Sequence, residues 1–123
     1  MGVTFKKEEA ILVFILDGEN TINQAEKAFR QALGNPDEID TFSVLIDART
    51  SSRHRDLSEV SSFAEFLITY KGRIRDKCAL VIDEKRPKSL ELERRLAGFS
   101  IREKIEFGLF YDIESAKSWL EQQ

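Results

Sequence analysis

The feature that most constrains the fold is a set of short apolar runs that alternate with segments of helical periodicity. ILVFIL (residues 11–16) and CALVI (residues 78–82) contain no charged side chain. A strand that is apolar at every position is covered on both faces, which is typical of a parallel sheet between helices. Helices between such strands predict right-handed crossovers. The chain is therefore expected to adopt an α/β fold.

The expected elements follow one another with short connections. The helix-start signals are Thr21, Asp56, Ser89 and Asp112, and the expected strands are residues 3–6, 11–16, 42–46, 78–82 and 105–111. The first two strands flank KEEA and predict a hairpin, which makes the sheet mixed. The predicted order is β-β-α-β-α-β-α-β-α, in a single domain over residues 1–123 with a mostly parallel sheet of about five strands and helices on both faces.

Two helix starts have a capping-box spacing, in which side chains satisfy backbone N–H groups that the first turn leaves unpaired. Thr21 and Gln24 form the first such pair, and the helix after them is expected to end at residues 34–36. Asp56 and Glu59 resemble a second, and that helix is expected to run to about Ile74. The apolar positions expected on the first helix are Ile22, Ala25, Phe29 and Leu33, and those expected on the second are Leu57, Val60, Ala64, Leu67 and Ile74.

Composition excludes several classes of function. A net charge of −3 argues against nucleic acid as the partner. No apolar stretch approaches the roughly 20 residues that span a bilayer, so stable membrane insertion is not expected. The start MGVTFKKEEA lacks the apolar segment of a secretory signal, which favours a cytoplasmic location. The single cysteine, Cys78, permits no internal disulfide and is expected to be buried.

Catalytic motifs are also scarce. The chain has one histidine, His54, and no glycine-rich phosphate loop. Asp17, Asp47 and Asp83 each end a predicted strand, so an alternative is a Mg²⁺ site for metal-assisted phosphate chemistry at the sheet edge. Aspartates at strand ends more often cap turns. We therefore expect no enzymatic activity, no metal and no cofactor.

The order of elements resembles that of the STAS domains, and the details are similar to the SpoIIAA-like branch, which is related in fold to the lipid-binding SEC14 (CRAL-TRIO) domains. The likeness rests on ILVFILDGENT, VLIDART, KCALVID and IEFGLFYDIESAKSWL, and it covers nearly the whole chain. In that branch the last helix typically contains Ala-x-x-Trp-Leu, which here is residues 116–120. The resemblance implies a non-catalytic module that binds another protein.

In some members of that family, phosphorylation of a serine gates binding. The serine lies at the start of the helix after the third strand, which corresponds here to Asp56-Leu57-Ser58-Glu59. Leu57 occupies the expected serine position and no glycine follows, so Ser58 is the candidate after a one-residue shift. A phosphate there would meet the positive end of the helix dipole. The alternative is that Asp56 caps the helix, Glu59 closes the box and Ser58 has no special role.

Basic residues gather in the loops after the third and fourth strands. Such loops lie at the carboxyl edge of a parallel sheet, where α/β ligands usually bind. We predict that they receive a phosphate-bearing ligand or an acidic partner, the alternative being a solvated charged edge. We call these residues the basic rim: Arg49, Arg53, His54, Arg55, Lys85, Arg86 and Lys88.

The second helix carries an additional aromatic stripe beside its apolar face, formed by Phe63, Phe66 and Tyr70. This stripe indicates either deep burial or contact with a second chain or a lipid-like ligand. The chain's 9 phenylalanines suggest an alternative function as a SEC14-like carrier or sensor of a small amphipathic ligand. The favoured prediction is a non-catalytic regulatory or protein-interaction module with an anion-responsive loop at residues 49–59, whose partner is another protein or a second copy.

Overall fold

The computed structural model describes residues 2–8, 10–33, 42–51, 57–70, 74–83, 94, 98 and 106–122. Strand β1 pairs antiparallel with β2, and the pairs β2–β3, β3–β4 and β4–β5 are parallel. The five strands form one sheet in chain order: β1 (Gly2–Glu8), β2 (Ile11–Asp17), β3 (Phe42–Asp47), β4 (Ile74–Val81) and β5 (Glu106–Phe110). The predicted mixed, mostly parallel α/β sheet is confirmed.

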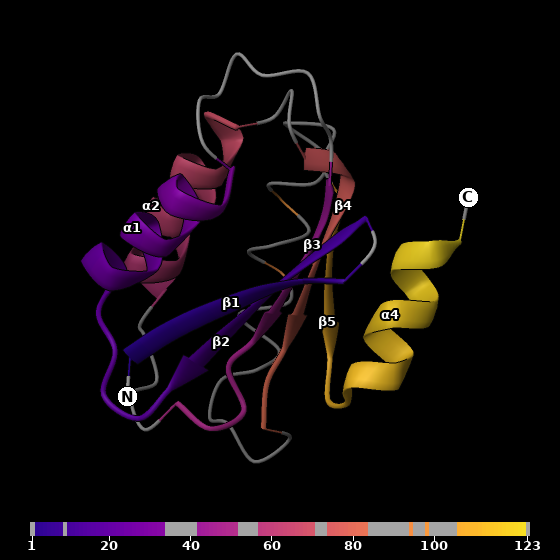
Figure 1. Cartoon of the computed structure of the whole chain (residues 1–123), viewed down its shortest axis with the longest axis horizontal. Helices are drawn as coiled ribbons and strands as arrows, with labels where there is room; N and C mark the ends of the chain where they lie inside the picture. The colour runs from indigo at the N-terminus through magenta and orange to yellow at the C-terminus, as the bar shows by residue number, and fades with distance from the viewer. Residues whose placement is uncertain are drawn as a thin grey trace.

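Helices cover both faces of the sheet. Helices α1 (Ile22–Leu33) and α2 (Leu57–Ile68) lie on one face, and α4 (Ile113–Glu121) lies on the other (Figure 1). The apolar run of β2 divides between the two layers because successive strand residues point to opposite faces. Phe14 belongs to the core under α1 and α2, whereas Val13 belongs to the core under α4. This division explains why residues 11–16 of β2 are apolar at every position.

Helix α1 begins as its sequence predicts. The Thr21 hydroxyl accepts from the Gln24 N–H at 3.1 Å, and the Gln24 side chain accepts from the Thr21 N–H at 2.9 Å. These reciprocal bonds form a capping box. The helix buries Phe29, whose ring stacks on Phe14 of β2 at 3.7 Å between centroids.

The predicted extent of the second helix is wrong. Helix α2 ends at Ile68, and Ile74 is the first residue of β4. At the helix end, the N–H and hydroxyl of Thr69 both donate to the Phe66 carbonyl, at 3.1 and 2.6 Å, and the Tyr70 N–H donates to the Leu67 carbonyl at 2.9 Å. These bonds to the third preceding residue tighten the last turn and end the helix.

The helix expected after Ser89 falls mainly outside the described residues. Between 84 and 105 the structure describes Arg94 and Gly98, and both have helical backbone. The last helix begins as expected, because the Asp112 side chain accepts from the Ser115 N–H at 2.7 Å. At its other end, the Lys77 ammonium donates to the carbonyls of Trp119 and Gln122 at 2.9 Å each. A cation at this position complements the negative end of the helix dipole.

Candidate functional site

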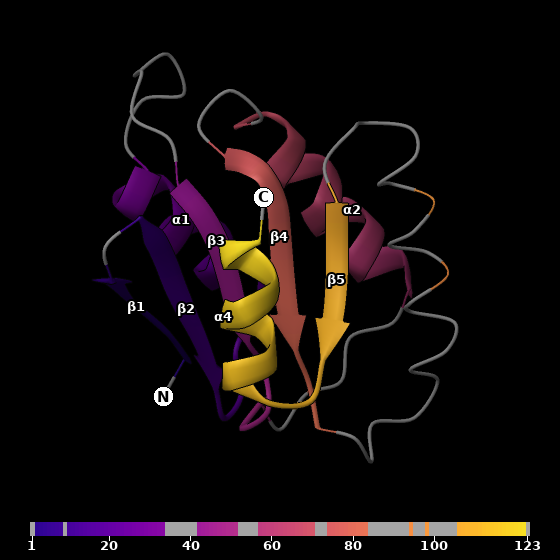
Figure 2. The same cartoon turned by 90° about the vertical axis from the view of Figure 1, so that its right-hand side faces the viewer.

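The carboxyl ends of the parallel strands lie along one edge of the sheet, which is the lower edge in Figure 2. Residues at the ends of β2, β3, β4 and β5, or just after them, are joined there by backbone hydrogen bonds. The Ala48 N–H donates to the Val81 carbonyl at 2.8 Å, and the Ile82 N–H donates to the Phe110 carbonyl at 2.9 Å. The strand ends are therefore held in register where ligands of α/β sheets usually bind. We call this region the carboxyl edge.

A buried amide joins the ends of β2 and β3 at the carboxyl edge. Asn20 is 1% exposed, and its side-chain N–H groups donate to the Ser51 hydroxyl at 2.9 Å and to the Gly18 carbonyl at 3.2 Å. The Gly18 N–H donates to the Thr50 carbonyl at 3.0 Å, and Gly18 forms a parallel bridge with Ser51. Gly18 has a φ of 57°, which favours glycine. These contacts extend the β2–β3 pairing into the loop.

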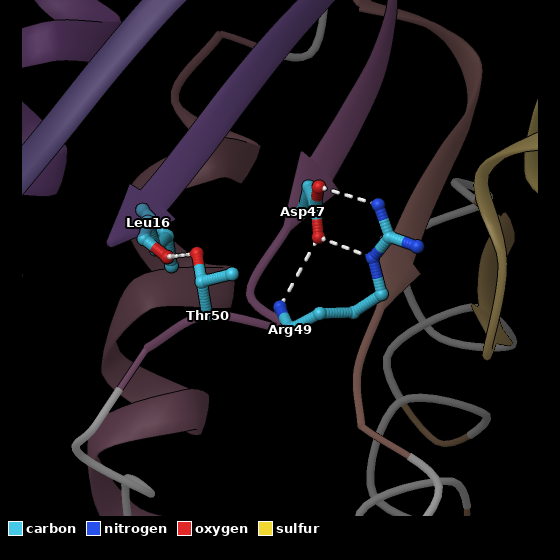
Figure 3. A network of polar contacts seen from close by, with 4 residues as sticks. All are labelled: Leu16, Asp47, Arg49 and Thr50. Atoms are coloured by element: carbon cyan, nitrogen blue, oxygen red, sulfur yellow. Dashed lines mark hydrogen bonds and ion pairs between the residues drawn. The ribbon is translucent and has the colours of Figure 1, made fainter. Parts of the chain in front are cut away.

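The loop after β3 has two further attachments, which Figure 3 shows. The Thr50 hydroxyl donates to the Leu16 carbonyl at 3.4 Å. The Arg49 guanidinium binds both carboxylate oxygens of Asp47, at 3.0 and 3.1 Å, and the Arg49 backbone N–H also donates to Asp47 at 3.1 Å. The hydrogen bonds that Arg49 donates to Asp47 raise the pKa of Arg49, and the charges of Asp47 and Asp112 add to this effect. Arg49 is therefore a fixed cation that is already paired with a carboxylate.

The β5 end contributes Tyr111 and Asp112. The Ser115 N–H and hydroxyl hydrogen-bond the Asp112 carboxylate and hold its pKa below the ordinary value, and the charge of Arg49 contributes. Tyr111 is 48% exposed, although it is a large aromatic side chain. Arg49 is also exposed, with 40% of its side chain accessible. The carboxyl edge thus presents an arginine and a tyrosine to solvent on a backbone that hydrogen bonds hold in place.

The predicted basic rim is described only at Arg49. The other predicted members lie outside the described residues: Arg53, His54, Arg55, Lys85, Arg86 and Lys88. Ser58 is the second residue of α2, but the structure does not describe its side chain. The anion-receiving function of the rim and the phosphorylation of Ser58 therefore stay predictions.

The aromatic stripe of α2 faces the other core aromatics. Phe63 and Phe66 are half-buried, with ring centroids 5.3 and 6.3 Å from that of Phe29, and Tyr70 is 5% exposed. The guanidinium carbon of Arg30 lies 5.1 Å from the centre of the Phe66 ring. The stripe thus packs between α1, α2 and the sheet, and its predicted function as an interface stays a prediction.

The structure also locates Cys78 and the three aspartates of the alternative Mg²⁺ site. Burial raises the pKa of the Cys78 thiol to about 12, so the thiol is protonated at neutral pH. Asp47 is held by Arg49, while Asp17 and Asp83 are exposed. Across the described ranges, no group of three or more His, Cys, Asp and Glu side chains is arranged so that it could hold a metal ion.

Sequence analysis missed Asn20 and Tyr111. Asn20 stands in the turn GEN, where an asparagine is equally common as a solvated turn residue. Tyr111 ends an apolar run, and that pattern does not distinguish a buried ring from an exposed one. The pairing of Asp47 with Arg49 had a local signal, because the two charges stand two residues apart at a strand end.

No family model matches the chain, and no curated protein matches it. A solved structure does. It is an uncharacterized protein of the DUF3478 family from Shewanella loihica PV-4 with a SpoIIAA-like fold, 18% identical, with a TM-score of 0.61 over 96% of this chain and 91% of that one. The chain has a SpoIIAA-like fold. The resemblance predicted from the order of elements is therefore confirmed.

At this identity the match establishes the SpoIIAA-like fold, and function has to be argued from the chain's own residues. The same sheet, with α1 and α2 on one face and α4 on the other, positions the carboxyl edge. None of the helices in the described part of the chain is long and apolar enough to cross a membrane.

Proposed function

We propose that this SpoIIAA-like chain is a non-catalytic regulatory module that binds another protein through the carboxyl edge. The observation that carries the proposal is the exposure of Tyr111 and Arg49 at one edge of the sheet. Tyrosine and arginine are enriched among the residues that dominate binding energy at protein interfaces. Arg49 interacts electrostatically with Asp112, the residue next to Tyr111, and on this ground we assign Arg49 and Tyr111 to one surface.

The backbone of this surface is preorganised. Asn20 and Thr50 attach the loop after β3 to the end of β2, and Asp47 orients the Arg49 side chain. A side chain that is already held in one geometry loses less conformational entropy when a partner binds. The carboxyl edge is therefore a preformed surface that a partner can bind without first ordering it. An acidic group of that partner would compete with Asp47 for Arg49.

Two observations favour binding over catalysis or ligand transport. The Cys78 thiol is buried and protonated, so the chain's only cysteine is not in the state of a nucleophile. Among the described phenylalanines, whose number motivated the carrier alternative, Phe14, Phe29 and Phe63 are joined in one series of ring contacts. Rings that fill the layer between sheet and helices act as core.

A native pull-down from the source cell, with bound proteins identified by mass spectrometry, tests the proposal. The matched pair of variants is Tyr111→Ala at the carboxyl end of β5 and Glu106→Ala at its amino end, since both side chains are exposed. We expect Tyr111→Ala to lose the partner that the parent and Glu106→Ala retain. Equal recovery with both variants would contradict the assignment of the carboxyl edge, and capture of a lipid in place of a protein would favour the carrier.

The anion-responsive part of the proposal has its own test. Attraction between exposed charges is screened over about 8 Å at physiological ionic strength, so binding of an acidic partner should weaken as salt is added. Reversing Arg53 and Arg86 together should cost more affinity than reversing Lys6 and Lys7 of β1. Equal affinities of the two double variants would mean that the basic rim is only a solvated edge.

A further inference from the structure

Strand β1 is one of the two edge strands of the sheet, as Figure 2 shows at the left, and β5 is the other. Its residues 4–7 are all exposed, whichever face they point to. An edge strand presents backbone N–H and carbonyl groups along its outer side, where a further strand can pair with them. With seven residues, β1 is long for an exposed edge.

The side chains of β1 divide cleanly between the two faces of the sheet. Phe5 lies opposite Phe14 in the β1–β2 register, and Val3 and Lys7 share its face toward α1 and α2. Lys6 lies opposite Val13, and it shares the α4 face with Thr4 and Glu8. On that second face, Glu8 accepts from Lys117 of α4 at 2.6 Å and pairs with Lys6 at 2.9 Å.

Phe5 is the unusual residue of this edge. It is 42% exposed, and of the described residues only Phe5 and Tyr111 are large apolar side chains with such exposure. Its ring contacts Phe14 at 5.9 Å between centroids, so the side chain is held at the margin of the core. Tyr111 belongs to the carboxyl edge, and Phe5 therefore marks a second surface.

We propose that β1 pairs antiparallel with β1 of a second copy, with Phe5 opposite Phe5 of the partner, so that the two sheets join edge to edge. This register places every residue of Gly2–Glu8 opposite another residue of the strand. The opposed pairs are Gly2 with Glu8, Val3 with Lys7, Thr4 with Lys6, and Phe5 with itself. No two like charges are opposed, and the two phenylalanines form an aromatic cross-strand pair.

The lysines of β1 select this register over its neighbours. Lysine on an edge strand usually opposes strand addition. A shift of the partner by two residues in one direction sets Lys6 opposite Lys6, and a further shift sets Lys7 opposite Lys7. A shift in the other direction leaves Lys7 and Glu8 without an opposed residue of β1. The register with Phe5 opposite Phe5 is thus favoured over the shifted registers, because it opposes no like charges and pairs the full length of β1.

The proposed dimer is distinct from the carboxyl edge and from the α2 stripe, so its failure would leave the proposed function intact. A contact through one strand is smaller than the roughly 800 Å² per partner of a standard interface. We therefore expect a dimer whose population rises with protein concentration. The two copies would be related by a two-fold axis through the Phe5 pair.

Cysteine crosslinking at single positions tests the register. In Phe5→Cys the two new side chains would be directly opposite, within about 5.5 Å, which is close to disulfide geometry. In the control Thr4→Cys, the two cysteines would lie on a diagonal about 7–8 Å apart, too far to bridge. Cys78 is buried in both variants. Under mild oxidation we expect a disulfide dimer from Phe5→Cys and none from Thr4→Cys, and equal yields from the two would overturn the register.

Charge pairing provides an independent measurement. We expect Phe5→Glu and Phe5→Lys each to sediment as monomers, because each variant would oppose two like charges, and we expect their mixture to recover the dimer. Circular dichroism of each variant establishes that the fold is kept. Phe66→Glu on α2 should leave the parent's dimer unchanged. A parent that stays monomeric at the highest soluble concentration, or a dimer lost in Phe66→Glu but kept in Phe5→Glu, would overturn the proposal.

Discussion

The ring of Trp119 in α4 lies against the backbone of Gly108 in β5. A Cβ atom built on Gly108 would be 2.7 Å from Phe110 Cε2, closer than Cβ atoms pack, and 3.1 Å from Trp119 Cη2, which is tighter than most Cβ contacts. The Phe110 and Trp119 rings contact each other at 5.4 Å between centroids. Gly108 thus allows the two rings to lie close to the strand, and α4 is seated on the sheet at this point.

We predict that Gly108→Ala destabilises the fold by about 1–2 kcal/mol, because both rings must move to admit the methyl group. Trp119 is the only tryptophan, so its fluorescence reports the displacement directly. The measurement is denaturant unfolding followed by fluorescence and by circular dichroism.

Gly98→Ala is the matched control for this change. Gly98 has helical backbone, and nothing lies within 4 Å of a Cβ built there. Alanine is favoured over glycine in a helix by up to about 1 kcal/mol, so this variant should be as stable as the parent or more stable. Identical unfolding midpoints for Gly108→Ala and the parent would contradict the packing argument.

The buried amide of Asn20 gives a second prediction. Asn20→Ala removes the donor to the Ser51 hydroxyl and the Gly18 carbonyl in a buried site, which should cost about 1–3 kcal/mol of unfolding free energy. The Gly18 N–H, which donates to Thr50, should also lose protection against hydrogen exchange. Asn23→Ala is the control, since Asn23 is exposed in α1. Equal stability and protection in the two variants would show that Asn20 does not hold the loop.

The sheet and the helix starts could be predicted from the sequence because the apolar runs and the capping residues indicated the same order of elements. The apolar run at residues 11–16 lies within β2, and the box of Thr21 and Gln24 starts α1. Asp112 caps α4 as expected. The end of α2 and the start of β4 were misjudged, since β4 begins at Ile74 and not at Cys78. Ile74 continues the helical spacing of Leu67, and an apolar residue at that spacing also suits the start of a buried strand, so periodicity alone does not separate the two.

The candidate site was less accessible to sequence analysis, because its properties depend on contacts between distant segments. Asn20 and Ser51 are 31 residues apart, and neither has a local pattern that indicates the buried bond between them. The sequence identified Arg49 as a candidate anion-binding residue. It did not reveal that the guanidinium already hydrogen-bonds the Asp47 carboxylate, with which an anion would have to compete. Tyr111 differs from the buried aromatic residues in its exposure. That exposure depends on how β5 and α4 pack, which the local sequence does not indicate.

Glu8 yields a pH prediction. Hydrogen bonds from Lys117 and then from Lys6 lower the pKa of Glu8 from its ordinary 4.5 to about 2. A carboxyl whose pKa is lower in the folded state contributes stability above its unfolded pKa and loses it as pH falls. This contribution should therefore be present above pH 4.5 and disappear between pH 4.5 and about 2.

Carbon-detected NMR titration of the Glu8 carboxyl measures this pKa directly. Lys117→Gln should raise the pKa of Glu8 more than Lys6→Gln does, because the bond to Lys117 has the larger effect. Glu8→Gln should flatten the acid limb of the stability curve, whereas Glu121→Gln, at an exposed position in α4, serves as the control. A measured pKa of 4.5 in the parent would show that neither lysine binds Glu8 in solution.

The Cys78 thiol should be inert in the folded protein. Its pKa of about 12 leaves little thiolate at neutral pH, and thiolate is the reactive form. We expect a chromogenic disulfide reagent to label Cys78 slowly in native buffer and rapidly in guanidinium chloride, where the chain unfolds. Rapid labelling without denaturant would mean that β4 opens or that the thiol is activated, and would weaken the argument against nucleophilic catalysis.

The pairing of Asp47 with Arg49 leads to the sharpest test of the carboxyl edge. Asp47→Asn keeps an oxygen for the Arg49 backbone N–H but removes the negative charge that holds the guanidinium. If the edge receives anions, the released arginine should bind inorganic phosphate more tightly than the parent does, and the chemical shift of its Nε–H should move as phosphate is added. Arg49→Gln in the same background should abolish the gain, because glutamine carries no charge. Should Asp47→Asn and the parent respond identically to phosphate, Arg49 serves the loop and not a ligand.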